Sequence, residues 1–345
     1  MPRPRIAFAL FMFVCFAFLS GCASKQAQWE QLLEQGRQRT ASDLQRLQQH
    51  LAAGHIRNAT LLRMYARHIK KNSPQMAEIA DTLALDASAE GPLYQGLARR
   101  LEDVRQDIQT APSRGEQAVL QVAGELESIR MAAAPENFDA ALSDPVNVLA
   151  DMSGGELGRV ESMAKEASLR ANNAKDFGAG SQLIGNPNYG QWRQRSDGTS
   201  FWEFYGMYSM FSNIIGAVRY GDWARYRDYS YYHDWGRDYY RSPRQRRQEN
   251  TVFKSAKEKF SRQGKSFDSP YAKKRGTTAS SSSRFASRVR QVSNPPGKFS
   301  SSYPSSRSGN KRAAGASQRS SGSFLSNYNS RGRSSVSRSF GGGGK

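Results

Sequence analysis

The chain has 345 residues, of which 38% are hydrophobic, and a formal net charge of +20 at pH 7. Residues 241–345 hold 24 Lys and Arg against 3 Asp and Glu, a net charge of +21, which leaves the preceding residues at −1. The charge therefore belongs to one end of the chain and not to a uniformly basic domain. Two cysteines, Cys15 and Cys22, are too few for a disulfide framework.

The N-terminus has the pattern of an export signal. Arg3 and Arg5 precede a stretch of 14 residues, Ile6 to Leu19, that contains no charged side chain. A transmembrane helix needs about 20 apolar residues, so this stretch is too short to span a membrane comfortably. We therefore expect a signal peptide over residues 1–21.

Directly after the apolar stretch, Leu19-Ser20-Gly21-Cys22 resembles the lipobox of bacterial lipoproteins. The resemblance implies that Cys22 receives a diacylglyceryl group, becomes the first residue after cleavage and carries acyl chains such as palmitate in a membrane. Residues 22–24 would form this anchor. Ala23 and Ser24 are not the acidic residues that retain such proteins at the inner membrane of enteric bacteria, so we expect the outer membrane. A secretory signal cleaved nearby or an uncleaved anchor is the alternative.

Cleavage before Cys22 would also remove Cys15 with the signal peptide. The one remaining thiol would then be consumed by lipid, so we expect no disulfide, no cysteine metal site and no thiol nucleophile in the exported protein.

Residues 25–175 have the periodicity of a helical domain. Trp29, Leu32 and Leu33 begin a pattern of apolar residues that recur every three or four positions, which is typical of one helix face. Helix breaks are expected at Ser42-Asp43, Gly54, Ser73-Pro74, Gly91-Pro92, Ala111-Pro112-Ser113 and Ala134-Pro135. A final helix is expected from Gly155 or Glu156 to Asn172. These lengths predict a mainly α fold, an irregular antiparallel helical bundle.

Residues 176–240 form a Gly- and aromatic-rich module. Within residues 189–240, 17 of 52 side chains are aromatic. Ser196-Asp197-Gly198, between two aromatic segments, predicts a tight hairpin. Phe201 to Phe211 is compatible with a strand or a helix. Five aromatic residues are candidates for binding a ligand, a bilayer or a partner: Trp192, Trp202, Tyr205, Trp223 and Trp235. The alternative is that these rings form a packed core on the helical bundle.

Residues 241–345 are rich in Ser, Gly, Arg and Lys, with few apolar residues. Such a segment buries too little apolar surface to offset its conformational entropy, so we expect a long disordered tail. One short stretch within it, Thr251–Phe260, is a candidate for a transient basic helix. Export argues against nucleic acid as its partner. The abundant anions outside the inner membrane are lipopolysaccharide, phospholipid and acidic wall polymers, which a polybasic segment attracts. A linker without a dedicated partner is the alternative.

Catalytic chemistry has weak support in the sequence. His50, His55, His68 and His233 lack the spacing of metal ligands, so we expect neither a metal nor a cofactor. The carboxylates of the aromatic module are the remaining candidates for catalysis, as a pair that hydrolyses a wall glycan: Glu203, Asp222, Asp228, Asp234 and Asp238. Most of these carboxylates have an arginine within four residues, so local ion pairs explain them without catalysis. We therefore expect a non-enzymatic lipoprotein of the cell envelope with a binding or scaffolding role. The wider chain resembles only uncharacterised bacterial lipoproteins, a resemblance that implies no activity.

Overall fold

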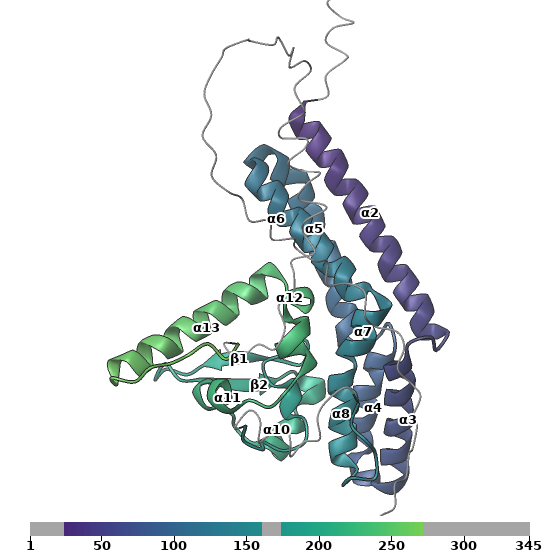
Figure 1. The fold of residues 1–345 in the computed structure, drawn as a ribbon, viewed down its shortest axis with the longest axis vertical. Coiled ribbons are helices and arrows are strands. Elements are labelled where there is room, and N and C mark those ends of the chain that lie inside the picture. The colour runs from purple at the N-terminus through teal and green to yellow at the C-terminus, as the bar shows by residue number, and fades with distance from the viewer. Residues whose placement is uncertain (1–23, 161–173, 272–345) are drawn as a thin grey trace, which may run out of the picture. The chain divides into compact units, whose positions relative to one another are not determined.

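A computed structural model describes residues 24–160 and 174–271 of the chain (Figure 1). The expected signal peptide, Cys22, most of the helix expected up to Asn172 and the chain beyond Tyr271 lie outside the described residues. Residues 153–160, where that helix was expected to start, form turns and irregular chain. The predicted fold class is confirmed: helices dominate, and one aromatic-rich module contains a β-hairpin.

The first helix, α2 (Lys25–Ala52), runs through Ser42-Asp43 without interruption, so the break expected there is wrong. The helix continues because one apolar face runs its whole length: Trp29, Leu33, Leu44, Leu47 and Leu51 are all buried. Thr40, also buried, donates its hydroxyl to the carbonyl of Gly36 at 2.8 Å, which satisfies its polar group inside the helix.

Helices α5 (Pro92–Arg114) and α6 (Glu116–Ala133) form an antiparallel hairpin that packs along α2 (Figure 1). The break expected at Ala111-Pro112-Ser113 is wrong by a few residues, because Pro112 is accommodated in the last turn of α5. The chain reverses instead at Gly115, whose φ of 93° strongly favours glycine.

Shorter helices complete the helical part of the molecule. They are α3 (Arg57–Asn72), the 3₁₀ turn η1 (Pro74–Met76), α4 (Ala77–Ala84), η2 (Leu85–Ala87), α7 (Pro135–Ala141) and α8 (Ser143–Met152). Helix α3 packs against both α4 and α8. The breaks predicted at Gly54, Ser73-Pro74, Gly91-Pro92 and Ala134-Pro135 are confirmed. Within the described residues, no helix has both the length and the apolar character required to cross a membrane.

The predicted hairpin is formed by β1 (Gly190–Gln194) and β2 (Ser200–Phe204), which pair antiparallel. The N–H of Arg195 donates to the carbonyl of Thr199 at 2.9 Å and closes a three-residue loop. Gly198, the last residue of that loop, has a φ of 76°, which is the left-handed position such hairpins assign to glycine.

The segment Phe201–Phe211 combines strand and helix. Its strand ends at Phe204, and the 3₁₀ turn η4 (Gly206–Tyr208) and α10 (Phe211–Ile215) follow. Another 3₁₀ turn, η3 (Ser181–Leu183), precedes the hairpin. The module continues through α11 (Tyr220–Tyr226), the π-helical turn η5 (Tyr232–Gly236) and α12 (Arg237–Tyr240). Its rings and the apolar residues of the helices belong to one continuous core.

Two buried aspartates of the helical part hold the aromatic module by hydrogen bonds. Asp86 accepts the hydroxyl of Tyr189 at 2.8 Å and the N–H of Leu93 at 3.1 Å. Asp144 accepts the hydroxyl of Ser230 at 2.8 Å and the N–H groups of the two following residues at 2.8 and 3.0 Å. Because both carboxylates are completely buried, the module is fixed to the helices by polar contacts as well as by packing.

The expectation of disorder from residue 241 is wrong for the first part of that segment. Ser242 caps α13 (Pro243–Arg262) in a capping box with Gln245. Four apolar residues, spaced by a helical turn, pack against the core: Val252, Phe253, Ala256 and Phe260. Beyond the helix, the ring of Phe267 stacks on that of Phe260 with centroids 4.7 Å apart. These apolar side chains bury enough surface to order the helix, although the average composition of residues 241–345 predicted too little burial for folding.

Candidate functional site

Three of the five aromatic residues expected to bind a ligand are packed inside the protein. Trp192, Trp202 and Trp223 are 8%, 6% and 1% exposed, and the ring centroid of Trp192 lies 5.2 Å from those of both other tryptophans. These rings are therefore core residues and offer no face to a ligand. Tyr205 and Trp235, at 40% and 39% exposed, remain at the surface.

Four of the five carboxylates considered for glycan hydrolysis are engaged by neighbouring groups, whereas Asp222 is exposed. The hydrogen bond from Arg193, at 2.6 Å, lowers the pKa of Glu203 below its usual value, whereas a catalytic acid needs a raised pKa. Arg227 holds both oxygens of Asp234, at 2.6 and 3.1 Å. The others are Asp238, paired with Arg241 at 2.9 Å, Asp228, buried and accepting the N–H of Tyr229 at 2.7 Å, and Asp222, exposed on α11.

The four histidines lie in separate settings, except that the rings of His50 and His55 are in contact. His68 bonds to Glu156 at 2.6 Å, and His233 bonds to the carbonyl of Ile184 at 2.7 Å. Burial holds the pKa of His233 well below its usual value, so this imidazole is neutral. Among the described residues, no group of three or more His, Cys, Asp or Glu could hold a metal ion.

The prominent chemical feature of the described surface is the outer side of α13 and the turn after it. Helix α13 turns its phenylalanines inward, toward the core, and its long cationic side chains outward. We call the six exposed cations the cationic face: Arg244, Arg247, Lys254, Lys257, Arg262 and Lys265. Within the described part of the chain, none of the six has an ion-pair partner, and Glu258 is the one exposed acidic side chain between residues 243 and 265.

Spacing and packing explain why these cations share one side. Residues three or four apart lie on one face of a helix, and most members of the cationic face follow that spacing. The inward side chains fix the rotation of the helix. Lys259 donates to the hydroxyl of Thr199 in the hairpin loop at 2.8 Å, and Arg225 of α11 stacks on Phe260 with its guanidinium carbon 4.3 Å from the ring centroid.

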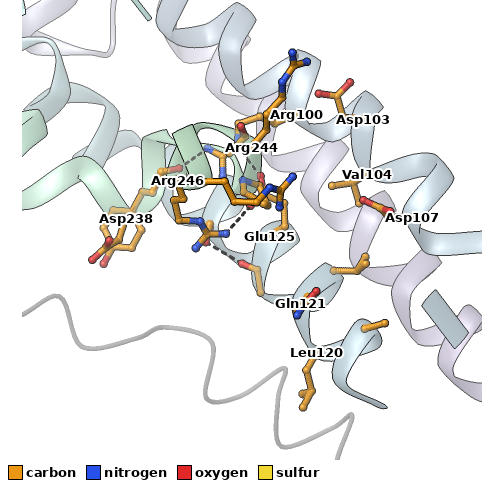
Figure 2. Close-up of a pocket in the computed structure, with 18 of the residues that line it drawn as sticks. Arg100, Asp103, Val104, Asp107, Leu120, Gln121, Glu125, Asp238, Arg244 and Arg246 are labelled. Carbon is orange, nitrogen blue, oxygen red and sulfur yellow. Dashed lines mark hydrogen bonds and ion pairs between the residues drawn. The ribbon is translucent and has the colours of Figure 1, made fainter. Parts of the chain in front are cut away.

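At its N-terminal end, α13 meets α5 and α6 and forms a groove lined by charged side chains (Figure 2). Arg100 and Glu125 form a buried ion pair at 2.7 Å on the floor of the groove, and Arg246 approaches the same carboxylate at 3.5 Å. A second glutamate, Glu249, is shared in the same way by Arg237 and Arg241, at 2.8 and 2.6 Å. These shared carboxylates leave arginine in excess at this junction.

Sequence reasoning placed the basic residues in a tail and missed their ordered helix. The sequence did contain a signal, the helical spacing of Val252, Phe253, Ala256 and Phe260 within a largely polar segment. The groove could not be predicted from the sequence in this way. Its residues come from α5 and α6 on one side and from residues 238–250 on the other, which are more than 100 positions apart in the chain.

Comparison with known proteins finds no matching family model, no matching curated protein and no matching solved structure. The functional inference therefore depends on the surface of the described residues. On that surface, six exposed cations without ion-pair partners lie on α13 and the turn after it, and such a concentration of positive charge attracts anions.

Proposed function

We propose that this protein is a lipid-anchored, non-enzymatic lipoprotein of the cell envelope that binds an anionic envelope polymer through the cationic face of α13. The observation that carries this proposal is the set of six exposed cations without ion-pair partners in the described structure. Positive charges near an anionic surface contribute about 1 kcal/mol each, so several on one helix give useful binding without a deep pocket.

The remaining chain supports the same partner chemistry. Residues 272–345 contain 15 Lys and Arg and no Asp or Glu. These residues would make further contacts, through their positive charges, with the anionic polymer that α13 binds. Because the backbone of α13 is already ordered, binding through its cations costs little further backbone entropy, and the remaining entropic cost is that of the side chains.

The proposed anchor is Cys22, three residues before the start of α2 at Lys25. With several acyl chains the attachment would be stable, whereas one chain alone gives only marginal, reversible binding. Ala23 and Ser24 favour the outer membrane. The lipid at Cys22 and the cationic face would then serve different tasks, one holding the protein at the bilayer and the other holding the polymer.

Charge-neutralising variants of the full-length protein test this proposal. We expect Lys254→Gln, Lys257→Gln and Arg262→Gln together to weaken binding to purified lipopolysaccharide by about tenfold or more at low salt. A matched control removes three exposed cations from α3, by Arg57→Gln, Arg67→Gln and Lys71→Gln. An equal loss in both variants would mean that net charge alone matters, and the proposed site on α13 would then be rejected.

A further inference from the structure

The groove at the N-terminal end of α13 has a volume of about 900 Å³ (Figure 2). Ligand pockets usually measure roughly 300–1,000 Å³, so the groove has room for a small ligand or for the end of a polymer. Three arginines from the start of α13 line it: Arg244, Arg246 and Arg247. The groove therefore differs from the rest of the cationic face, which is an exposed surface without a floor.

The floor of the groove carries more guanidinium than carboxylate. Arg100 and Glu125 have side chains only 6% and 5% exposed, and the pair is completed within the protein at 2.7 Å. Arg246, 40% exposed, shares that glutamate at the longer distance of 3.5 Å. One buried carboxylate thus serves two guanidiniums, and the charge of Arg246 is only partly compensated.

The other carboxylates of the lining are mostly engaged. Asp107 pairs with Arg114 at 3.2 Å, and Asp238 pairs with Arg241 at 2.9 Å. Asp103 is exposed on α5 and has no ion-pair partner among the described residues. The lining as a whole has five arginines against four carboxylates, an excess of one positive charge. The excess lies at the start of α13, where Arg244 and Arg247 have no ion-pair partner among the described residues.

We propose that this groove binds a phosphate monoester, a deepening of the proposed function in which the groove recognises the phosphate and the cationic face holds the polymer that carries it. A phosphate monoester bears about −1.5 to −2 charge at pH 7, which is opposite in sign to the excess charge of the groove. The planar guanidinium forks of Arg244, Arg246 and Arg247 can each donate two N–H groups to its oxygens, which a lysine cannot do.

The test is calorimetric titration of inorganic phosphate into the full-length protein, at constant ionic strength and pH 8. We expect saturable binding that Arg244→Gln with Arg247→Gln weakens by about tenfold or more, because charge-assisted hydrogen bonds are lost. Asp103→Asn should strengthen binding by about threefold, because it removes a like charge from the lining. All three positions are exposed, so thermal unfolding should confirm intact folding in these variants.

A distal variant separates this proposal from the proposed function. Lys257→Gln with Arg262→Gln alters the far end of the cationic face and should leave phosphate affinity unchanged. If phosphate gives no saturable heat, or if the distal variant weakens it as much as the groove variant, the phosphate site is rejected. Loss of lipopolysaccharide binding in the Lys254, Lys257 and Arg262 variant would still support the cationic face in that case. Saturable phosphate binding without any lipopolysaccharide binding would reject the proposed function alone.

Two further titrants identify the source of the phosphate. Glycerol phosphate represents a soluble or polymer-borne monoester, and vesicles containing phosphatidic acid represent a lipid monoester. Vesicles of phosphatidylglycerol, a diester, serve as the control. Binding to either monoester that depends on Arg244 and Arg247 supports the site, whereas equal binding to monoester and diester vesicles contradicts it.

Discussion

Asp86 should make the stability of the fold depend on pH in an unusual direction. Burial raises the pKa of this carboxyl from its usual 3.8 to about 7, although hydrogen bonds from Tyr189 and Leu93 act in the opposite sense. The folded protein therefore keeps a proton that the unfolded chain releases near pH 4. Stability from this group is complete below about pH 4 and is lost as the pH rises to 7.

The size of this effect follows from the shift in pKa. One unit corresponds to about 1.4 kcal/mol, so Asp86 should lower the free energy of unfolding by about 4 kcal/mol between pH 4 and pH 7. Asp144, whose pKa is raised to about 6 chiefly by burial, should add about 3 kcal/mol in the same direction. Ordinary carboxylates that gain ion pairs on folding give the opposite slope, so the two classes can be separated.

Asp86→Asn tests this reasoning by removing the ionisation while keeping the size of the side chain. Urea unfolding at pH 4.5, 6 and 8 should show that the variant loses less stability with rising pH than the parent protein does. Tyr189→Phe removes the hydroxyl that donates to Asp86 and should cost about 1.5–3 kcal/mol at pH 8, where the carboxylate is charged, and less at pH 4.5. Identical slopes for Asp86→Asn and the parent would refute the assignment of a buried, protonated carboxyl.

Three further predictions concern the core, the junction and the anchor. Trp223→Ala should cost about 3–5 kcal/mol in chemical unfolding because its ring is buried, whereas Trp235→Ala, at an exposed position, should cost about 1 kcal/mol or less; similar losses would contradict the packing described. Glu125→Gln should cost about 3 kcal/mol, since it leaves Arg100 buried without its carboxylate, and an unchanged unfolding midpoint would argue against that pair. Cys22→Ser should move the protein from the detergent phase to the aqueous phase in phase partitioning, and a variant that stays with detergent would contradict lipidation at Cys22.

The helical fold could be predicted from sequence where proline and glycine mark the ends of helices. Gly54 and Pro135 stand at real breaks because one closes a turn and the other cannot continue a helix. The prediction of a break at Ser42-Asp43 was wrong because the residue types that cap helices also occur on exposed helix surfaces. There the apolar face of α2, fixed by tertiary packing, outweighed the local preference.

The candidate site was only partly predictable. Basic charge at the C-terminal end was evident from composition, but its placement on α13 depends on the burial of Phe253 and Phe260, two apolar residues in a polar segment. The tryptophans illustrate the opposite difficulty. Trp192 and Trp223 have the same side chain as Trp235, and only the packing of the hairpin against α11 decides which rings are buried.

The ordered cationic face of α13 is proposed to contact the polyanion. The most direct test of this contact is the salt dependence of lipopolysaccharide binding by the full-length protein, with and without the substitutions Lys254→Gln, Lys257→Gln and Arg262→Gln. Each contact with a polyanion contributes slightly less than one to the slope of log affinity against log salt, so the slope should fall by about two to three in this variant. An unchanged slope and affinity would show that these cations do not touch the polymer.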